Sequence, residues 1–218
     1  YSIRNVVCAD EYAEGVDDNA FTNGSAMRAL QAASKAAALC GEKAPAIWNT
    51  IAASLRIPRF EDGTTREYED YDGRIIKQAD ANLLAYPLGL VTNTEEIRRD
   101  LAYYEPRIDA GPAMSYSILA LQHARLGDGG KAYELFSRSY QPNRVAPFGV
   151  TAEYAGTDNC YFATGAGGML QAVINGFCGL EITDKGIRQL PSALPAHWKR
   201  VTVKGAGPER KNYTKENH

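Results

Sequence analysis

The sequence predicts a mainly α-helical chain that passes into a small β region near Gly179. Stretches with apolar residues at helical spacing fill the first two thirds of the 218 residues. From residue 179 onward, polar and apolar residues alternate around turn signals, as in short strands. Long polar loops join successive helix pairs, which favours part of a helical toroid over a bundle with short loops.

The first two predicted helices lie at residues 19–39 and 45–57. The first helix is rich in alanine and ends before Gly41, and its small residues permit close approach of another helix. The second has Pro45 in its first turn, where the missing N–H is tolerated, and stops before Pro58.

A polar segment rich in glycine and aspartate, residues 58–74, is predicted to be a loop. A short helix is expected within residues 75–90, ending near Pro87. Thr94 is the predicted N-cap of the next helix, residues 95–106.

The remaining elements are three helices and a β region. The helices are predicted at residues 113–127, 129–140 and 165–177. Strand-like alternation occupies residues 179–190 and 197–205, and the turn at residues 184–186 is the clearest break.

Composition limits the partners and the environment of the chain. A net charge of -2 gives no reason to expect a nucleic acid or an anionic membrane as partner. No apolar run approaches the roughly 20 residues of a membrane helix, so no membrane partner is expected. The chain begins at Tyr1 within what reads as an ordered segment, so we expect a piece of a longer polypeptide. Its compartment stays open: a soluble protein, periplasmic or secreted if the source is bacterial.

The four cysteines are Cys8, Cys40, Cys160 and Cys178. Their spacing contains no CxxC pair and no nearby histidine to complete a zinc site. With 44% hydrophobic residues the chain can build a core without disulfides, so buried free thiols are predicted. Neither a metal nor a cofactor is expected.

A cluster of acids near the N-terminus is the first candidate site. It contains Asp10, Glu11, Glu14, Asp17 and Asp18. The spacing does not match a calcium loop of the EF-hand type, and the glutamate at position twelve is missing. A solvated acidic turn and a catalytic carboxylate with supporting neighbours both remain open, although interleaved apolar residues favour a loop packed against something.

Glu153 is a candidate partner carboxylate far along the chain. It lies among small, aromatic and glycine residues with only Asp158 as another acid nearby. Glycoside hydrolysis uses two carboxyl groups, one to protonate the leaving oxygen and one to activate water or attack the sugar. Spacing alone does not single out this pair, because a chain with 26 acids offers many pairs.

The glycine-rich stretch at residues 164–168 superficially resembles a nucleotide-binding loop. The GxGxxG spacing fails at Leu170 and no strand precedes it, so close packing near the sugar site is the better interpretation. Tyr12, Tyr154 and Tyr161 are predicted to be core residues, with sugar stacking as the alternative.

Four blocks in order carry a resemblance to glycoside hydrolase family 65. "ADEYAEGVDDNAFTN" resembles the D-E-Y-H-E-x-V-x-x-N-A-[YF]-T-N stretch of that family, and the likeness continues at residues 77–89, 111–120 and 161–183. The family contains disaccharide phosphorylases and α-glucoside hydrolases on an (α/α)6 barrel. The resemblance implies that residues 1–178 are the C-terminal half of the barrel catalytic domain and residues 179–218 the start of a C-terminal β domain.

The resemblance implies that Glu11 is the general acid. An acid that is protonated at working pH needs a raised pKa, which burial and the neighbouring Asp10 or Glu14 are expected to supply. Ala13 stands where the family usually has histidine, which puts any contact of that histidine in doubt but not the acid.

The resemblance also implies a binding pair, Lys77 and Gln78, for hydroxyls of the non-reducing glucose. Their chemistry suits this role, because lysine offers three donors and the amide offers donors and an acceptor. Without the resemblance, "KQAD" would be interpreted as an exposed helix start.

The presence of Glu153 favours water over phosphate as the second reactant. A glutamate would repel a phosphate dianion, and no histidine lies between His123 and His197. A glutamate at this place is the general base of the hydrolytic branch of the family, and the surrounding sequence looks most like that branch. The implied outcome is inversion, with carboxyl groups about 6.5–9.5 Å apart.

The expected function is that of an inverting, exo-acting α-glucoside hydrolase that releases glucose. The branch implies α-1,2-linked substrates, either kojibiose-like small molecules or glucosyl-galactose units of a glycan. The alternatives are a family 65 inverting disaccharide phosphorylase and a non-catalytic carbohydrate-binding fragment. The expected protein partner is the N-terminal half of the barrel, as a missing segment or a second chain, and the sequence is compatible with an oligomer.

Overall fold

The computed structural model describes residues 1–110, 113–159 and 161–217 and divides into two compact units, Tyr1–Asp109 and Ala110–His218. Among the described residues, helices dominate, and the strands form four two-stranded sheets. Cys160 and the Gly111–Pro112 start of one family-like block lie outside the described residues.

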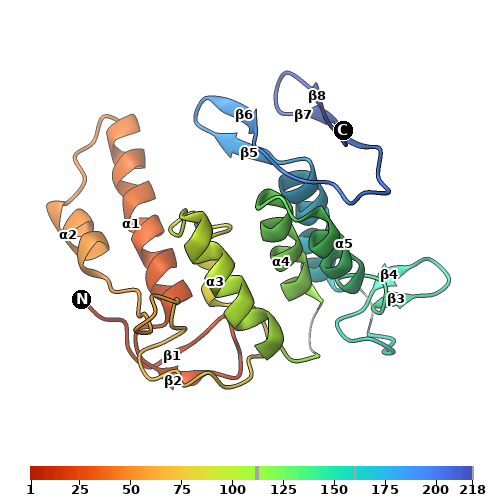
Figure 1. The fold of residues 1–218 in the computed structure, drawn as a ribbon. Helices are drawn as coiled ribbons and strands as arrows, with labels where there is room; N and C mark the ends of the chain where they lie inside the picture. The colour runs from red at the N-terminus through yellow and green to blue at the C-terminus, as the bar shows by residue number, and fades with distance from the viewer. Residues whose placement is uncertain (111–112, 160, 218) are drawn as a thin grey trace. The chain divides into compact units, whose positions relative to one another are not determined.

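The first unit contains the longest helix, α1 (Ala20–Leu39), which confirms the predicted helix (Figure 1). The Asn19 side chain caps it by accepting a hydrogen bond from the Thr22 N–H. Gly41, at φ 75°, follows the helix end, where a left-handed backbone suits glycine. Helix α2 (Ala46–Ser54) packs against α1 and ends at Ser54 rather than Ile57, because the backbone turns extended at Leu55.

The predicted helix within residues 75–90 shrinks to a single 3-10 turn, η1 (Ala81–Leu84). The backbone that precedes η1 forms hydrogen bonds with other segments. The Ile76 N–H donates to the Arg107 carbonyl, and the Lys77 N–H donates to the Asp10 carboxylate. The Ile76 carbonyl in turn accepts from the Asp109 N–H in a bridge to Ile108, so it does not accept the i+4 bond of a helix, and local sequence cannot reveal this.

Helix α3 (Thr94–Tyr104) forms as predicted, with a different cap. Asn93 is the N-cap, because its Oδ1 accepts from the Glu95 and Glu96 N–H groups, so the prediction of Thr94 was wrong by one residue. The 3-10 turn η2 (Glu105–Arg107) follows directly.

Two very short strands precede α1, namely β1 (Val6–Val7) and β2 (Glu14–Val16). They pair antiparallel, with Val6 opposite Val16 and Val7 opposite Glu14. The sequence did not predict them, because two or three residues are too few to show an alternating period.

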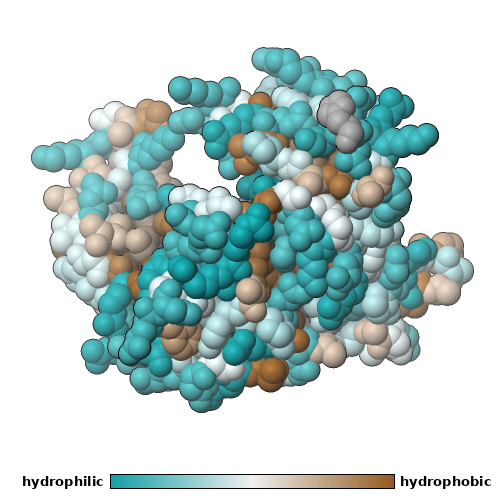
Figure 2. Space-filling model, viewed as in Figure 1, coloured by the Kyte–Doolittle hydropathy of each residue, from teal (hydrophilic) through white to brown (hydrophobic). Residues whose placement is uncertain are grey.

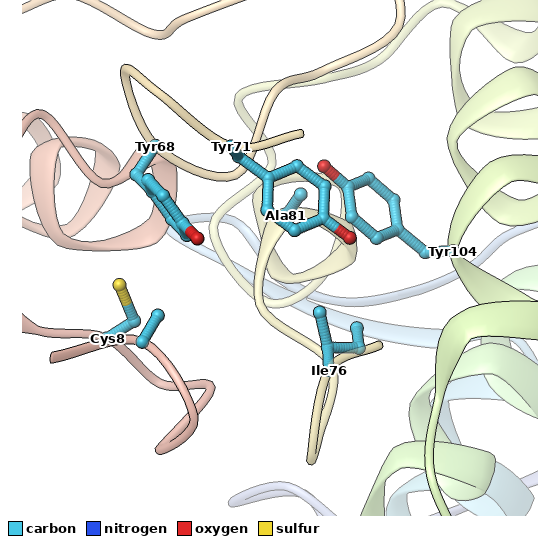
Figure 3. Close-up of a cluster of buried hydrophobic side chains, with 7 residues drawn as sticks. Cys8, Tyr68, Tyr71, Ile76, Ala81 and Tyr104 are labelled. Atoms are coloured by element: carbon cyan, nitrogen blue, oxygen red, sulfur yellow. The ribbon is translucent and has the colours of Figure 1, made fainter. Parts of the chain in front are cut away.

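The core of the first unit is aromatic. Figure 3 shows the rings of Tyr71 and Tyr104 next to each other, with centroids 5.9 Å apart, and the side chain of Cys8 in the same cluster. Burying a tyrosine requires a partner for its hydroxyl. Tyr71 donates to the Arg74 carbonyl at 2.6 Å and Tyr104 to the Thr65 carbonyl at 2.7 Å, so each core ring also fixes a loop.

The second unit is built on α4 (Met114–Arg125), α5 (Gly129–Arg138) and α6 (Ala163–Gln171), and α6 continues as the π-helix η3 (Ala172–Phe177). A Cβ on Gly168 would lie 3.1 Å from Ser117, and one on Gly176 would lie 2.9 Å from the Leu121 Cα. These two glycines therefore permit close packing on α4, whereas packing of the glycine-rich stretch near a sugar site stays a prediction.

The β region of the second unit consists of hairpins. They are β3 (Arg144–Val145) with β4 (Val150–Thr151), β5 (Leu180–Thr183) with β6 (Gly186–Gln189), and β7 (Arg200–Ala206) with β8 (Lys211–Glu216). The change from helix to strand after Phe177 matches the prediction. The compact units divide after Asp109, so a domain boundary after residue 178 stays a prediction.

Helix α1 exposes much of its surface within this chain. Its buried residues are Ala20, Asn23 and Gly24, whereas Leu39 at its end is 80% exposed. Figure 2 shows white and tan residues over α1 and α2, in line with their many alanines. Across the described part of the chain, none of the helices combines the length and apolarity of a membrane span.

Candidate active site

The loop that carries Glu11 connects β1 to β2 and is closed by main-chain bonds. The Cys8 N–H donates to the Ala13 carbonyl, and the Ala13 N–H donates to the Asp10 carbonyl, both at 3.0 Å. The Asp10 side chain tightens the same turn by accepting from the Tyr12 N–H at 3.2 Å. Glu11 therefore stands at the tip of a fixed turn.

This turn is locked against the segment that carries the predicted binding pair. The Lys77 N–H donates to Asp10 Oδ1 at 2.6 Å, and Gln78 Nε2 donates to the Ala9 carbonyl. In return the Ala9 N–H donates to Asp80 Oδ2 at 3.0 Å. The structure therefore brings together Glu11, Lys77 and Gln78, which lie far apart in the sequence.

Glu11 forms an ion pair with Lys77, Oε2 to Nζ. The Glu11 side chain is 57% exposed, and the hydrogen bond and charge of Lys77 lower its pKa from the ordinary value. This differs from the expectation that burial and neighbouring acids raise the pKa. In this chain Glu11 is a carboxylate held beside a cation.

Gln78 is buried, unlike a residue at an exposed helix start. Its Nε2 is engaged by the Ala9 carbonyl, whereas its Oε1 has no hydrogen-bond donor among the described residues. A buried acceptor without a donor is costly in a finished structure, and a ligand hydroxyl is one group that would satisfy it.

The other acids of the N-terminal cluster have separate structural tasks. Asp17 accepts from the Asn5 N–H at 2.9 Å, and the buried Asp18 accepts from Ser2 and from Asn23 Nδ2. Glu14 lies in β2 with its side chain exposed. The cluster is thus neither one solvated turn nor one cation loop, because Asp17 and Asp18 are bound to protein donors.

Behind the turn, two buried acids meet that the sequence did not single out, Glu67 and Asp80. Asp80 Oδ1 accepts from Asn19 Nδ2 at 2.9 Å, and its Oδ2 accepts from the Ala9 and Asp10 N–H groups. No N–H or O–H donor among the described residues reaches either oxygen of Glu67. Glu67 lies in a loop full of acids, so its sequence neighbourhood gave no signal.

The three acids at this place all have raised pKa values. Burial, then the negative charges of Asp80 and Asp10, raise the pKa of Glu67 to about 10. Burial raises the pKa of Asp80 to about 7, and its N–H donors act in the opposite direction. The pKa of Asp10 is also raised by burial, against the N–H bonds from Lys77 and Tyr12.

One group of described residues meets the distance requirement of a metal site. Ligand atoms of Cys8, Glu67 and Asp80 lie within 4.8 Å of one another. The donor set does not favour an ion: both oxygens of Asp80 are already taken by N–H groups, and burial raises the pKa of the Cys8 thiol, which keeps it neutral. A proton neutralises this cluster with less rearrangement.

Glu153 lies in the second unit, directly after β4. Asn143 fixes its main chain, because Asn143 Nδ2 donates to the Ala152 and Glu153 carbonyls at 3.1 and 2.9 Å. Ala152 is buried and the Glu153 side chain is half-buried. Glu11 and Glu153 belong to different compact units, so their pairing stays a prediction.

The prediction of three core tyrosines was wrong, and that of buried cysteines was partly wrong. Tyr12, Tyr154 and Tyr161 are all exposed, at 55%, 36% and 82%, because each belongs to a turn or loop next to a candidate acid or the glycine-rich helix. Cys8 and Cys178 are buried free thiols as predicted, whereas Cys40 is exposed because it follows the end of α1.

The comparisons with known proteins agree on one family. Residues 58–143 match the model of the glycosyl hydrolase family 65 central catalytic domain. The chain is 49% identical over 98% of its length to a kojibiose hydrolase of Mucilaginibacter mallensis and 51% identical over 98% to one of Flavobacterium johnsoniae. It is 36% identical over 94% to protein-glucosylgalactosylhydroxylysine glucosidase of Danio rerio.

The chain spans about a third of the length of these relatives, 32% in each case. Among solved structures, a putative kojibiose phosphorylase from the human microbiome superposes with a TM-score of 0.71 at 17% identity, covering 92% of this chain and 35% of that one. At this identity the likeness shows the fold alone. Residues 58–143 therefore match the glycoside hydrolase family 65 model, and nearly the whole chain is similar to about a third of two kojibiose hydrolases.

Proposed function

We propose that the chain is part of an exo-acting α-glucoside hydrolase that releases glucose from α-1,2-linked glucosides. The observation that carries the proposal is the contact of Glu11 with Lys77, on a turn locked against Gln78. The names of its relatives, kojibiose hydrolase and protein-glucosylgalactosylhydroxylysine glucosidase, support the substrate class.

Glu11 is the proposed general acid. The ion pair keeps it ionised in the unliganded chain, so the acid role requires the substrate to change its surroundings. A glucose residue that takes the hydrogen bonds of Lys77 and covers the exposed carboxyl removes both effects that favour the carboxylate, and the pKa of Glu11 rises. The protonated form then donates to the glycosidic oxygen as that bond breaks.

Lys77 and Gln78 are the proposed glucose-binding pair. Lys77 Nζ supplies donors and Gln78 Oε1 is a buried acceptor that a sugar hydroxyl would satisfy. Their backbone is held by the bonds to Asp10 and Ala9, so little ordering remains for the substrate to bring about.

Glu153 is the proposed general base. It removes a proton from a water molecule that attacks the anomeric carbon from the face opposite the leaving group, and the product is β-glucose. This inverting geometry needs about 6.5–9.5 Å between the two carboxyl groups. Asn143 supports the role by fixing the Glu153 main chain.

The proposed fold of the complete protein is an (α/α)6 barrel of which this chain is the C-terminal half. The exposed surface of α1 supports it, since a helix with so few buried residues gains stability when another helix covers it. The N-terminal half, as a missing segment or a second chain, is proposed to cover the exposed surface of α1.

The test uses the complete polypeptide that carries this chain, with kojibiose as substrate. We expect glucose release without phosphate, the β-anomer as first product by NMR, and a loss of at least about 1,000-fold in kcat for both Glu11→Gln and Glu153→Gln. Glu14→Gln is the matched control, since Glu14 is exposed nearby in β2, and it should keep its activity.

Three results would contradict the proposal. Dependence on added phosphate with formation of β-glucose 1-phosphate would indicate the phosphorylase instead. Binding of kojibiose by calorimetry without turnover would indicate a carbohydrate-binding fragment. Unchanged hydrolysis in Glu153→Gln would remove Glu153 from the base role.

A further inference from the structure

We propose that Asp80 is a positioning residue, whose buried carboxylate holds the turn of Glu11 against the segment of Lys77. The effect on catalysis rests on the proposed function, in which Glu11 is the acid. The structural part, that Asp80 fixes the turn, stands by itself.

The first observation is the direction of the Asp80 side chain. Asp80 stands at the N-cap position of η1, where an aspartate usually accepts from the first N–H groups of its own helix. Its side chain makes no such cap bond and is fully buried, at 0% exposure. Its Oδ2 accepts instead from the N–H groups of Ala9 at 3.0 Å and Asp10 at 3.4 Å. The carboxylate therefore binds the two residues that directly precede Glu11.

The second observation is that the two segments hold each other in both directions. Asp80 accepts from the turn, while Asp10 Oδ1 accepts from the Lys77 N–H at 2.6 Å. Gln78 adds a further bond, from its Nε2 to the Ala9 carbonyl. A shift of either segment by one residue would break these contacts and leave buried polar groups unpaired. The exchange of bonds thus defines a single register of the turn beside Lys77.

The third observation is that Asn19 orients the Asp80 carboxylate. Asn19 is fully buried, and its Nδ2 donates to Asp80 Oδ1 at 2.9 Å. The amide cannot be reversed without cost, because its Oδ1 accepts from the Thr22 N–H and hydroxyl at 2.8 and 2.7 Å as the cap of α1. Oδ1 of Asp80 is thus bonded to the helix start, and its Oδ2 stays directed at the turn.

A carboxylate suits this place because N–H donors lie at both of its oxygens. These donors favour the ionised form of Asp80, against the burial that raises its pKa. An asparagine would offer one acceptor oxygen and would set its NH2 group against one of the donors. The substitution Asp80→Asn therefore removes the acceptor with almost no change in volume.

The two segments differ in their other anchors. The binding segment is also held by the bridge between Ile76, directly before Lys77, and Ile108. Removing the Asp80 acceptor should therefore loosen the turn of Glu11 and leave the binding pair largely in place. This predicts a defect in proton donation by the proposed acid rather than in glucose binding.

The test compares Asp80→Asn with the wild type in the complete polypeptide on two substrates. Kojibiose needs a proton on its leaving oxygen, whereas the fluoride of α-glucosyl fluoride leaves as a weak base and needs little help from an acid. We expect kcat/KM of Asp80→Asn to fall at least about 30-fold for kojibiose and at most about threefold for α-glucosyl fluoride.

Asp100→Asn is the matched control, since Asp100 is also buried and accepts from a backbone N–H, that of Thr65 at 2.8 Å. Its partner lies in another loop, so this variant should lose stability but change kcat/KM for the two substrates by the same factor.

Asn19→Ser gives a second comparison if Asp80→Asn does not fold. Serine keeps the cap of α1 and removes the donor to Asp80 and to the Glu67 carbonyl. The loss of kcat/KM for kojibiose should be smaller, about three- to tenfold, and α-glucosyl fluoride should again be affected less.

Hydrogen exchange followed by mass spectrometry tests the structural part without activity. Peptides that cover residues 8–13 should exchange at least about tenfold faster in Asp80→Asn than in the wild type, because their amides open more often. In Asp100→Asn the same peptides should keep the wild-type rate.

Two results would overturn the inference. Equal losses for both substrates in Asp80→Asn would show a general loss of the folded site, and unchanged exchange of residues 8–13 would show that Asp80 does not hold the turn. If the wild-type polypeptide hydrolyses neither substrate, the proposed function fails, whereas exchange still decides the structural role of Asp80.

Discussion

At the scale of single residues, the contact of Lys77 with Glu11 has two opposing effects on catalysis. Lys77 is proposed to bind the glucose, which would favour the reaction, but its hydrogen bond and charge lower the pKa of Glu11, the proposed acid. The proposed mechanism requires the lysine to move from the carboxylate to the sugar as the substrate binds. The pH dependence of the reaction can report this exchange.

The variant Lys77→Met tests the balance. Without the cation the pKa of Glu11 rises, so the protonated acid persists to higher pH, and the alkaline limb of the kcat/KM profile should move to higher pH. The maximum of kcat/KM should fall by about 10- to 100-fold because a sugar contact is lost. Initial rates measured from pH 4 to 9 check this.

The control for Lys77→Met is Lys131→Met, which removes an ion pair with Glu134 on α5. That profile should be superimposable on the wild type. An alkaline limb that moves to lower pH in Lys77→Met would contradict the assignment of Glu11 as the acid.

Residue roles were only partly predictable. Glu11, Lys77 and Gln78 came from the family resemblance, and the structure brings them together. Glu67 could not be found, because four of its neighbours, Arg66, Glu69, Asp70 and Asp72, are also charged and only tertiary burial separates it from them. The direction in which the pKa of Glu11 is shifted could not be predicted either, since it depends on Lys77, which is distant in sequence.

At the scale of elements, helices and their caps are predictable from the sequence where the hydrogen bonds are local. Helix α1 and helix α3 both begin at an asparagine whose side chain accepts from the first turn. No helix begins at residues 76–77, because the backbone N–H groups of Ile76 and Lys77 and the Ile76 carbonyl bond to other segments. Secondary structure is therefore predictable from sequence where backbone hydrogen bonds are local, and not where a backbone group bonds to a distant segment.

The two capping asparagines differ in their other hydrogen bonds, and this difference predicts different losses of stability. Asn19→Ala removes the cap and also the Nδ2 bonds to the Glu67 carbonyl and Asp80, so we expect a loss of about 2–4 kcal/mol in the free energy of unfolding. Asn93→Ala removes a cap in an exposed setting and should cost about 1 kcal/mol.

Urea unfolding of both asparagine variants, followed by circular dichroism, checks the difference. Equal losses would mean that the two additional bonds of Asn19 contribute nothing. The control is Thr50→Ala, on the exposed surface of the neighbouring helix α2, and the stability of this variant should change little.

At the scale of the whole molecule, the buried acids make stability depend on pH in an uncommon direction. A carboxyl group with a folded pKa above its unfolded value binds a proton on folding, so its contribution is complete below the unfolded pKa of about 4.3 and is lost as pH rises toward the folded value. The folded pKa is about 10 for Glu67 and about 7 for Asp80, so their contributions to stability are lost as pH rises toward these values.

Glu67→Gln should remove the Glu67 part of this dependence. Relative to the variant, the wild type should become less stable by up to about 1.4 kcal/mol per pH unit between pH 5 and 9. Melting temperatures of both proteins across this range give the comparison. A difference that stays constant with pH would show that Glu67 is not protonated in the folded state.

The turn of Glu11 is held by its main chain and by Asp10, while the side chain of the next residue, Tyr12, points outward and reaches Asp109 through its hydroxyl at 2.8 Å. The scaffold of the acid is therefore independent of the side chain beside it. A saturation library at position 12 can therefore exchange this side chain without rebuilding the turn that carries Glu11.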